Sequence, residues 1–186
     1  MGTGGRVHTP GLPRPRRAHR RRPNTVAAYP IGIVRRLCRG LYDYPRISPK
    51  LGALSPLPDT VAQAIARQTD SVIQVAGSQA ANMLGLSWQV PAQPCYLTNG
   101  PSRRVRIGCR VINLRHASPR NLVAAGSAAG TVFQAVRDLG QGPATVSADT
   151  LASHLSPADR RRLARATSKA PAWMRPILDQ ITGVAG

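Results

Sequence analysis

The sequence predicts an α+β fold: a β-hairpin, a small mixed or antiparallel sheet with flanking helices, and a C-terminal cluster of helices. Three observations predict it. Short segments with apolar–polar alternation occupy the middle of the chain, a strong turn sequence separates two of them, and apolar residues repeat at helical spacing in the last third. A length of 186 residues favours one domain, or one domain plus a small appendage.

The first ordered element is expected at residues 33–44, as a strand or hairpin. This stretch is rich in β-branched residues, leucine and tyrosine, has a break at Gly40 and ends at Pro45. Residues 1–31 combine prolines and glycines without apolar periodicity, which predicts a disordered Arg/Pro-rich arm. Residues 45–58 contain four prolines, so we expect a stiff connector that runs across the surface.

Two helices and a strand are expected between residues 59 and 86. Val61, Ala62 and Ile65 lie at helical spacing behind an acidic first turn, which predicts a helix over residues 59–69. Residues 71–76 are predicted to form a short apolar strand, and residues 78–86 a helix that closes at Gly85.

The clearest turn of the chain is Asn99-Gly100-Pro101-Ser102. Strands are expected around it and after it, at residues 95–98, 104–107 and 110–115. Because Gly108-Cys109 is a tight link, we expect these strands to form an antiparallel meander. Their alternation predicts an apolar face and a basic face, with Val105, Ile107 and Val111 on the first and Arg104 and Arg106 on the second.

The last third of the chain is predicted to be helical. Helices are expected over residues 130–139, over residues 147–154, from residue 157, and from Pro171-Ala172-Trp173 through about Ile181. Ser156-Pro157-Ala158-Asp159 is a strong start signal, because it combines a capping hydroxyl, a proline at the first helical position and an acid three residues after the cap. Trp173 is expected to anchor the final helix in the core.

Positive charge is concentrated at the start of the chain. Residues 1–39 hold ten arginines and no acid, and the whole chain has a formal net charge of +19 with seven aspartates and no glutamate. Such a segment either lies on a polyanion or stays solvated, because it cannot pack against itself. The charge asymmetry points first to nucleic acid and second to an anionic protein partner.

The sequence favours a cytoplasmic protein. No apolar run approaches the roughly 20 residues of a membrane-spanning helix, and no apolar segment follows the basic N-terminus as in a secretory signal. Cys38, Cys95 and Cys109 are an odd and widely spaced set. They fit neither a disulfide framework nor a zinc pattern, and a reducing compartment is their simplest setting.

The candidate nucleic-acid-binding residues are arginines of three segments. They are Arg16, Arg17, Arg20, Arg21 and Arg22 in the arm, Arg35, Arg36 and Arg39 in the hairpin, and Arg103 and Arg104 beside the turn. Arginines in the arm can follow phosphates without reading bases, or remain solvated. The hairpin arginines are better placed to contact a backbone, although they also suit a solvated strand face. Residues 98–104 could bind an anion, but Asn-Gly-Pro alone is what a tight turn needs.

Material for catalysis is sparse in this sequence. His116 and Ser118 could support acid–base or nucleophilic chemistry, but a single histidine near a strand end is more often a hydrogen-bonded structural residue. No carboxylate pair and no His/Cys ligand cluster is apparent, and glutamate is missing. We therefore predict a protein that is not an enzyme and that uses no cofactor or metal. Arg160, Arg161, Arg162 and Arg165 form a basic helix face that could extend a binding patch or simply be solvated.

Several motifs in order carry a resemblance to a known bacterial family. They are residues 32–49, Leu84-Gly85-Leu86-Ser87 with Gln89-Val90-Pro91-Ala92, residues 96–104, Arg115-His116-Ala117-Ser118-Pro119, and Ala170-Pro171-Ala172-Trp173. The chain resembles the AbiEi-type antitoxins or transcriptional regulators of type IV toxin–antitoxin (abortive infection) systems, in particular a compact subgroup often left as a domain of unknown function.

This resemblance implies a winged-helix DNA-binding module followed by an α/β antitoxin domain. Residues 32–48 would be the remnant wing of that module and residues 49–182 the antitoxin-like domain. Such proteins are thought to repress their own operon and to counter a nucleotidyltransferase-type toxin without a stable complex. The partners implied are therefore the operator DNA and, functionally, such a toxin.

The chain departs from the family pattern before the wing. Relatives carry two or three helices there, including a recognition helix for the major groove. Here residues 14–23 occupy the place, and no helix of useful length fits between their prolines. A truncated or mis-framed start and a real loss of the module are the two explanations. The alternative function is a general RNA- or ribosome-associated basic protein; an enzyme acting on nucleic acid is disfavoured by the missing carboxylates.

Overall fold

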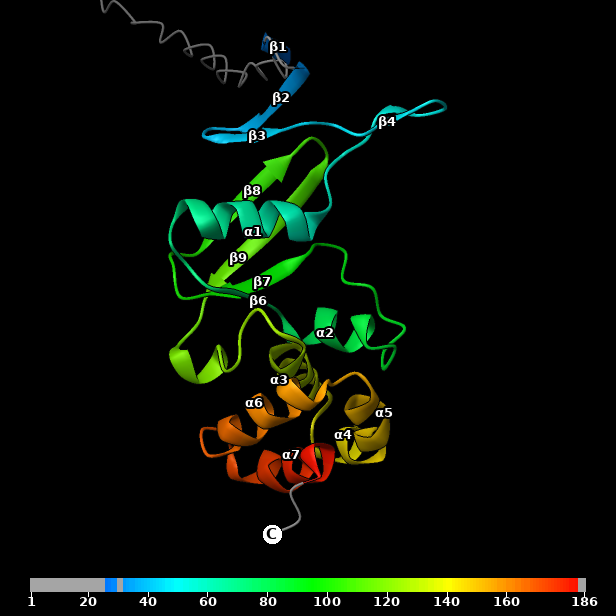
Figure 1. Cartoon of the computed structure of the whole chain (residues 1–186), viewed down its shortest axis with the longest axis vertical. Helices are drawn as coiled ribbons and strands as arrows, with labels where there is room; N and C mark the ends of the chain where they lie inside the picture. Colours follow the sequence, from blue (N-terminus) through cyan, green and yellow to red (C-terminus); the bar gives the residue numbers. More distant parts are fainter. Residues whose placement is uncertain (1–25, 30–31, 184–186) are drawn as a thin grey trace, which may run out of the picture.

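The computed structural model describes residues 26–29 and 32–183 and has the predicted α+β fold. A small β-sheet bearing a hairpin lies at one end of the long axis, a second sheet lies in the middle, and helices gather at the opposite end (Figure 1). The strands are β1 (Val26–Tyr29), β2 (Gly32–Cys38), β3 (Leu41–Asp43), β4 (Ile47–Ser48), β5 (Gly52–Ala53), β6 (Ile73–Val75), β7 (Cys95–Thr98), β8 (Arg103–Ile107) and β9 (Arg110–His116). The helices are α1 (Pro58–Gln68), α2 (Gly77–Met83), α3 (Ala128–Leu139), α4 (Gln141–Val146), α5 (Ala148–Ser153), α6 (Pro157–Thr167) and α7 (Arg175–Thr182), with short 3-10 turns at Pro119–Asn121 and Ala172–Met174.

The predicted hairpin is present as β2 and β3, joined by a turn in which Gly40 has φ of +76°. A left-handed backbone of this kind favours glycine, which explains the break in the sequence pattern. Strand β1 extends the hairpin into a three-stranded antiparallel sheet. The prediction that residues 1–31 are wholly irregular is therefore wrong for residues 26–29, because β2 supplies a hydrogen-bonding edge that local sequence does not show. Within the predicted connector, β4 and β5 form a second small hairpin.

The middle sheet has the strand order β6-β7-β9-β8. The predicted meander is wrong at its first link: β9 lies between β7 and β8, parallel to β7 and antiparallel to β8. Residues 99–102 cross the end of β9 and are fastened there, because the His116 backbone N–H donates to Ser102 Oγ at 2.8 Å and His116 Nδ1 lies 3.0 Å from the Gly100 carbonyl. The loop therefore passes over the position next to β7, and β9 occupies that position between β7 and β8.

The register of β8 and β9 also corrects the predicted faces of the sheet. The two-residue turn Gly108-Cys109 places Ile107 opposite Arg110, so Val105 pairs with Ile112 and Arg106 with Val111. Directly paired residues of antiparallel strands share a face. Val111 therefore lies on the arginine face, opposite to the prediction.

Helix α1 covers the apolar face of this sheet. Val61, Ala62 and Ile65, the residues predicted at helical spacing, are buried in one cluster with residues from three strands and from the hairpin. Those partners are Leu41, Tyr96, Ile107, Ile112 and Leu114. The hairpin is thus held by packing on α1 and the sheet.

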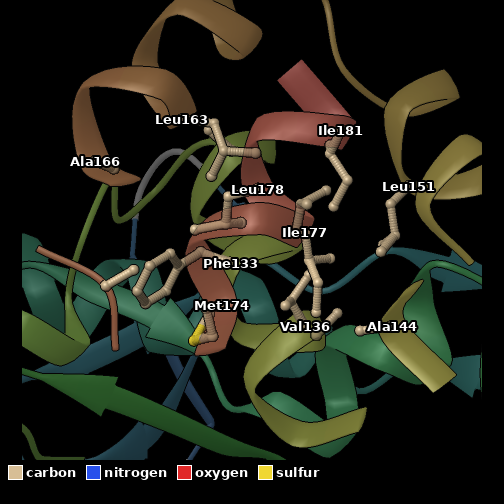
Figure 2. Close-up of a cluster of buried hydrophobic side chains, with 14 of the residues drawn as sticks. Phe133, Val136, Ala144, Leu151, Leu163, Ala166, Met174, Ile177, Leu178 and Ile181 are labelled. Atoms are coloured by element: carbon tan, nitrogen blue, oxygen red, sulfur yellow. The ribbon is translucent and has the colours of Figure 1, made fainter. Parts of the chain in front are cut away.

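A second aliphatic core lies between helices α2 to α7. Phe133 of α3 packs beside Met174 and Leu178 of the last helical segment, and Leu163 of α6 lies on the opposite side of Leu178 (Figure 2). The predicted helices of this region are present, and Ser156 caps α6 as expected, with Asp159 N–H donating to its Oγ at 3.2 Å. Trp173 is half-buried against this core. Helix α4 is an addition to the predicted set. Among the described helices, none has both the length and the apolar character that a membrane crossing requires.

Candidate nucleic-acid interface

The outer face of the hairpin pairs an arginine with a tyrosine. Arg36 of β2 and Tyr42 of β3 are direct cross-strand partners, so their side chains share a face, and both are exposed. Arg39 is exposed in the adjoining turn, and Tyr44 and Arg46 are exposed just after β3. We call Arg36, Arg39, Tyr42 and Tyr44 the hairpin patch. It offers two guanidinium groups and two phenol rings to solvent.

The hairpin patch is held by a contact on the inner face of the same strands. Arg35 NH2 donates to Asp43 Oδ2 at 2.5 Å and to the Leu54 carbonyl at 2.6 Å, and only 16% of the Arg35 side chain is exposed. Its Nε is buried and has no hydrogen-bond partner among the described residues. Arg35 therefore joins the hairpin to the segment that leads into α1. It is not available to phosphates, and we remove it from the predicted binding set.

Arg103 and Arg104, predicted to act together, lie on opposite faces of β8. Arg103 shares the covered face with its partner Leu114, and its Nε is buried. Burial raises the pKa of the nearby Cys38 thiol, while the Arg36 and Arg103 guanidinium groups oppose that rise. Arg104 pairs with Asn113 on the other face, where both side chains donate to Gln93 Oε1, at 3.5 Å and 3.0 Å. Because they lie on opposite faces, Arg103 and Arg104 cannot bind the same anion.

The turn between β7 and β8 uses its polar groups internally. Asn99 Oδ1 accepts from the Val72 backbone N–H at 2.8 Å, and the Gly100 N–H donates to Thr98 Oγ1 at 3.0 Å. Ser102 is engaged by His116, as described above. These bonds favour the structural explanation of the Asn-Gly-Pro sequence over an anion site.

A second basic surface lies on the uncovered face of the middle sheet. Arg104, Arg106 and Arg115 are exposed there, beside the half-buried Asn113 and Leu97. We call this surface the open sheet face. Arg106 and Arg115 are not among the predicted binding residues, although the alternation that separates Arg106 from Val105 is visible in the sequence. Their gathering depends on the strand order, which the sequence did not reveal.

The groups with potential for chemistry are tied into the fold. His116 is exposed and bound to the turn through Nδ1. Tyr96 is buried, donates to Asp59 Oδ1 and accepts from Gln79 Nε2 at 3.3 Å, and Gln79 Oε1 accepts from the Cys95 N–H at 3.1 Å. Burial raises the pKa of Tyr96, and the hydrogen bond to Asp59 raises it further. Sequence reasoning missed this network, which joins α1, β7 and α2.

Two further predictions concern the arginines of the N-terminal arm and metal binding. The arm arginines Arg16, Arg17, Arg20, Arg21 and Arg22 lie outside the described residues. Within the described ranges, no group of three histidine, cysteine or acidic side chains could hold a metal ion.

A family model described as a family of unknown function (DUF6088) matches residues 29–157, which is more than half of the chain. The chain therefore belongs to this family. No curated protein and no solved structure matches it. The matched region begins at the end of β1, includes the hairpin patch and the open sheet face, and ends at the first residue of α6.

Proposed function

We propose that this protein is a non-enzymatic, DNA-binding regulator of the antitoxin type, acting in the bacterial cytoplasm on a type IV toxin–antitoxin operon. The observation that carries the proposal is the hairpin patch. It presents arginines on a small β element at one end of the molecule, where a duplex can approach without meeting the helical end (Figure 1). The resemblance to AbiEi-type antitoxins supports the same function and implies that β2 and β3 correspond to the wing.

The patch is suited to phosphate contact. Arg36 Nε donates to the Cys38 carbonyl at 3.3 Å, which fixes the direction of the side chain and leaves the terminal nitrogens of its guanidinium facing solvent. A guanidinium group binds phosphate oxygens through parallel N–H donors. Contacts of this type position a protein on DNA and make its affinity depend on salt. The open sheet face offers a second set of arginines for the same purpose.

The first test measures binding of the full chain to its own promoter DNA and to a shuffled duplex, by fluorescence anisotropy over a range of salt concentrations. We expect preference for the promoter at moderate salt. The double variant R36A/R39A should bind both duplexes more weakly, with a salt slope smaller by about 0.9 for each phosphate that the variant no longer neutralises. R161A removes an exposed arginine from α6, at the end of the molecule opposite the hairpin (Figure 1), and is the control. Equal weakening in R161A would contradict an interface at the hairpin.

The antitoxin part of the proposal has its own test. The neighbouring gene is expected to encode a nucleotidyltransferase-type toxin, and co-expression of this protein should restore growth. Because no stable complex is expected, rescue should occur without co-purification of the two proteins. A neighbouring gene product that is harmless to the cell would refute this part while leaving DNA binding open to the first test.

The alternative function is a general RNA- or ribosome-associated basic protein, and one observation favours it. Tyr42 is 55% exposed and Tyr44 is 70% exposed. Exposed aromatic rings next to arginines stack on unpaired bases, at about 1–3 kcal/mol per base. If Y42A weakens binding to single-stranded RNA while duplex binding is unchanged, and promoter DNA has no advantage over shuffled DNA, this alternative replaces the regulator.

A further inference from the structure

A cavity of about 910 Å³ lies toward the helical end of the molecule. Segments that are far apart in the sequence form it: the 3-10 turn after β9, the second half of α3, the link after α6 and the start of α7. Its lining residues are Ser118, Pro119, Arg120, Asn121, Arg137, Ser168, Lys169, Ala170, Pro171 and Arg175. None of them belongs to the hairpin patch or to the open sheet face.

The charge of this cavity is one-sided. Arg120, Arg137, Lys169 and Arg175 line it, and none of the described carboxylates does. All four side chains are exposed. Like charges gathered at one place raise the local positive potential, even where water partly screens exposed side chains. The fold brings these four cations together from separate segments, and their charge suits an anionic ligand.

Two of the four cations are oriented by the protein. Arg137 NH1 donates to Asn121 Oδ1, and the buried Gln134 donates through Nε2 to the Asn121 carbonyl, so Asn121 is itself fixed. Arg175 Nε donates to the Ala170 carbonyl at 3.3 Å. These bonds leave other guanidinium N–H groups of both arginines for a ligand. Within the described parts of the chain, the side chains of Arg120 and Lys169 have no hydrogen bond or ion pair.

We infer that this cavity binds a nucleoside di- or triphosphate. Its volume falls in the range of small-molecule sites, roughly 300–1,000 Å³. Four cations exceed the need of a single phosphate group and match a chain of two or three, while arginine binds phosphate in a bidentate manner. Ser118 and Ser168 add hydroxyl donors, and the Pro119, Ala170 and Pro171 side chains give an apolar wall for a base or sugar.

The experiment titrates the full chain with GTP, ATP, pyrophosphate and inorganic phosphate by isothermal titration calorimetry at low salt. We expect the nucleoside triphosphates to bind most tightly and inorganic phosphate most weakly. R120A and K169A should each weaken triphosphate binding by about tenfold, the effect of losing one charge-assisted hydrogen bond. Neither side chain supports the described fold, so both variants should melt like the wild type.

The matched control is R161A, which removes an exposed arginine from α6 outside this cavity. Equal weakening in R161A, or equal affinity for inorganic phosphate and triphosphates, would overturn the inference. So would a short oligonucleotide that displaces GTP, binds more tightly and depends on Arg120 and Lys169, because the cavity would then bind nucleic acid. The inference is independent of the proposed function: R36A/R39A should weaken DNA binding and leave GTP binding unchanged.

Discussion

The helical end and the hairpin end of this molecule differ in how much of their apolar surface they bury. At the helical end, Phe133, Met174 and Leu178 are fully buried within one aliphatic core that several helices share (Figure 2). At the hairpin end, β3 buries Leu41 and leaves Tyr42 mostly exposed. A short hairpin cannot bury enough apolar surface to be stable by itself. It therefore depends on α1 and the sheet, and its outer side chains are free to contact a partner.

The largest expected effect comes from truncating the helical core. Leu178→Ala should lower the free energy of unfolding by ~3–5 kcal/mol, because it opens a cavity among fixed helices. Leu41→Ala should lower the free energy of unfolding by less, about 2 kcal/mol, because the hairpin can shift toward α1 and reduce the cavity. Chemical denaturation of both variants measures the difference. A larger loss for Leu41→Ala would reverse the comparison between the two ends.

The stability of the hairpin is expected to fall more when its ion pair between Arg35 and Asp43 is removed than when an exposed arginine is removed. Arg35→Ala leaves the partly buried Asp43 without its cation, and we expect a loss of roughly 1–3 kcal/mol. Hydrogen exchange should show faster exchange in β2 and β3 and little change in α3. R36A, on the outer face of the same strand, is the control. Uniform destabilisation of α3 would mean that the two ends unfold as one unit.

Tyr96 connects the two ends and makes stability depend on pH in the alkaline range. Its pKa is raised in the folded protein, so the neutral phenol is favoured there. The resulting stabilisation is fully present below the unfolded value of about 10 and is lost as pH rises above it. The unfolding free energy of the wild type should therefore fall more steeply above pH ~10 than that of Y96F. Parallel pH profiles for the two proteins would rule out this contribution.

The smallest effect is expected at the cap of α6. Ser156→Ala removes the acceptor for the Asp159 N–H and should cost about 1 kcal/mol. Ser55→Ala, in an exposed segment before α1, should be close to neutral. Thermal melts of both variants provide the measurement. A loss at Ser55 that matches the loss at Ser156 would show that capping is not its cause.

The hairpin shows what sequence reasoning reached and what it missed at the candidate site. Gly40 and the apolar pattern of residues 33–44 located β2 and β3, and Arg36 and Arg39 are exposed there as a binding surface requires. Sequence reasoning groups Arg35 with them, because adjacent arginines look alike in a sequence. Arg35 differs from Arg36 and Arg39 because the strand register places Asp43 directly opposite it, and the two side chains form an ion pair.

The open sheet face and the cavity were not predictable in the same way. Arg104 is identifiable beside a turn, whereas Arg106 and Arg115 join it only because β9 lies between β7 and β8. Lys169 and Arg175 carry no local signal of a site. Nothing in their neighbourhood in the sequence indicates that Arg120 and Arg137 will face them.

The sequence by itself determined the fold class, the positions of most helices, the hairpin turn, the Ser156 cap and the excess of positive charge. The charge follows from composition, and the rest follows from interactions between residues a few positions apart, where spacing fixes geometry. The tertiary structure alone decided the order of the strands, the inward direction of Arg35 and Arg103, and the gathering of four cations around one cavity. These depend on packing between distant segments, and no local pattern encodes which segments meet.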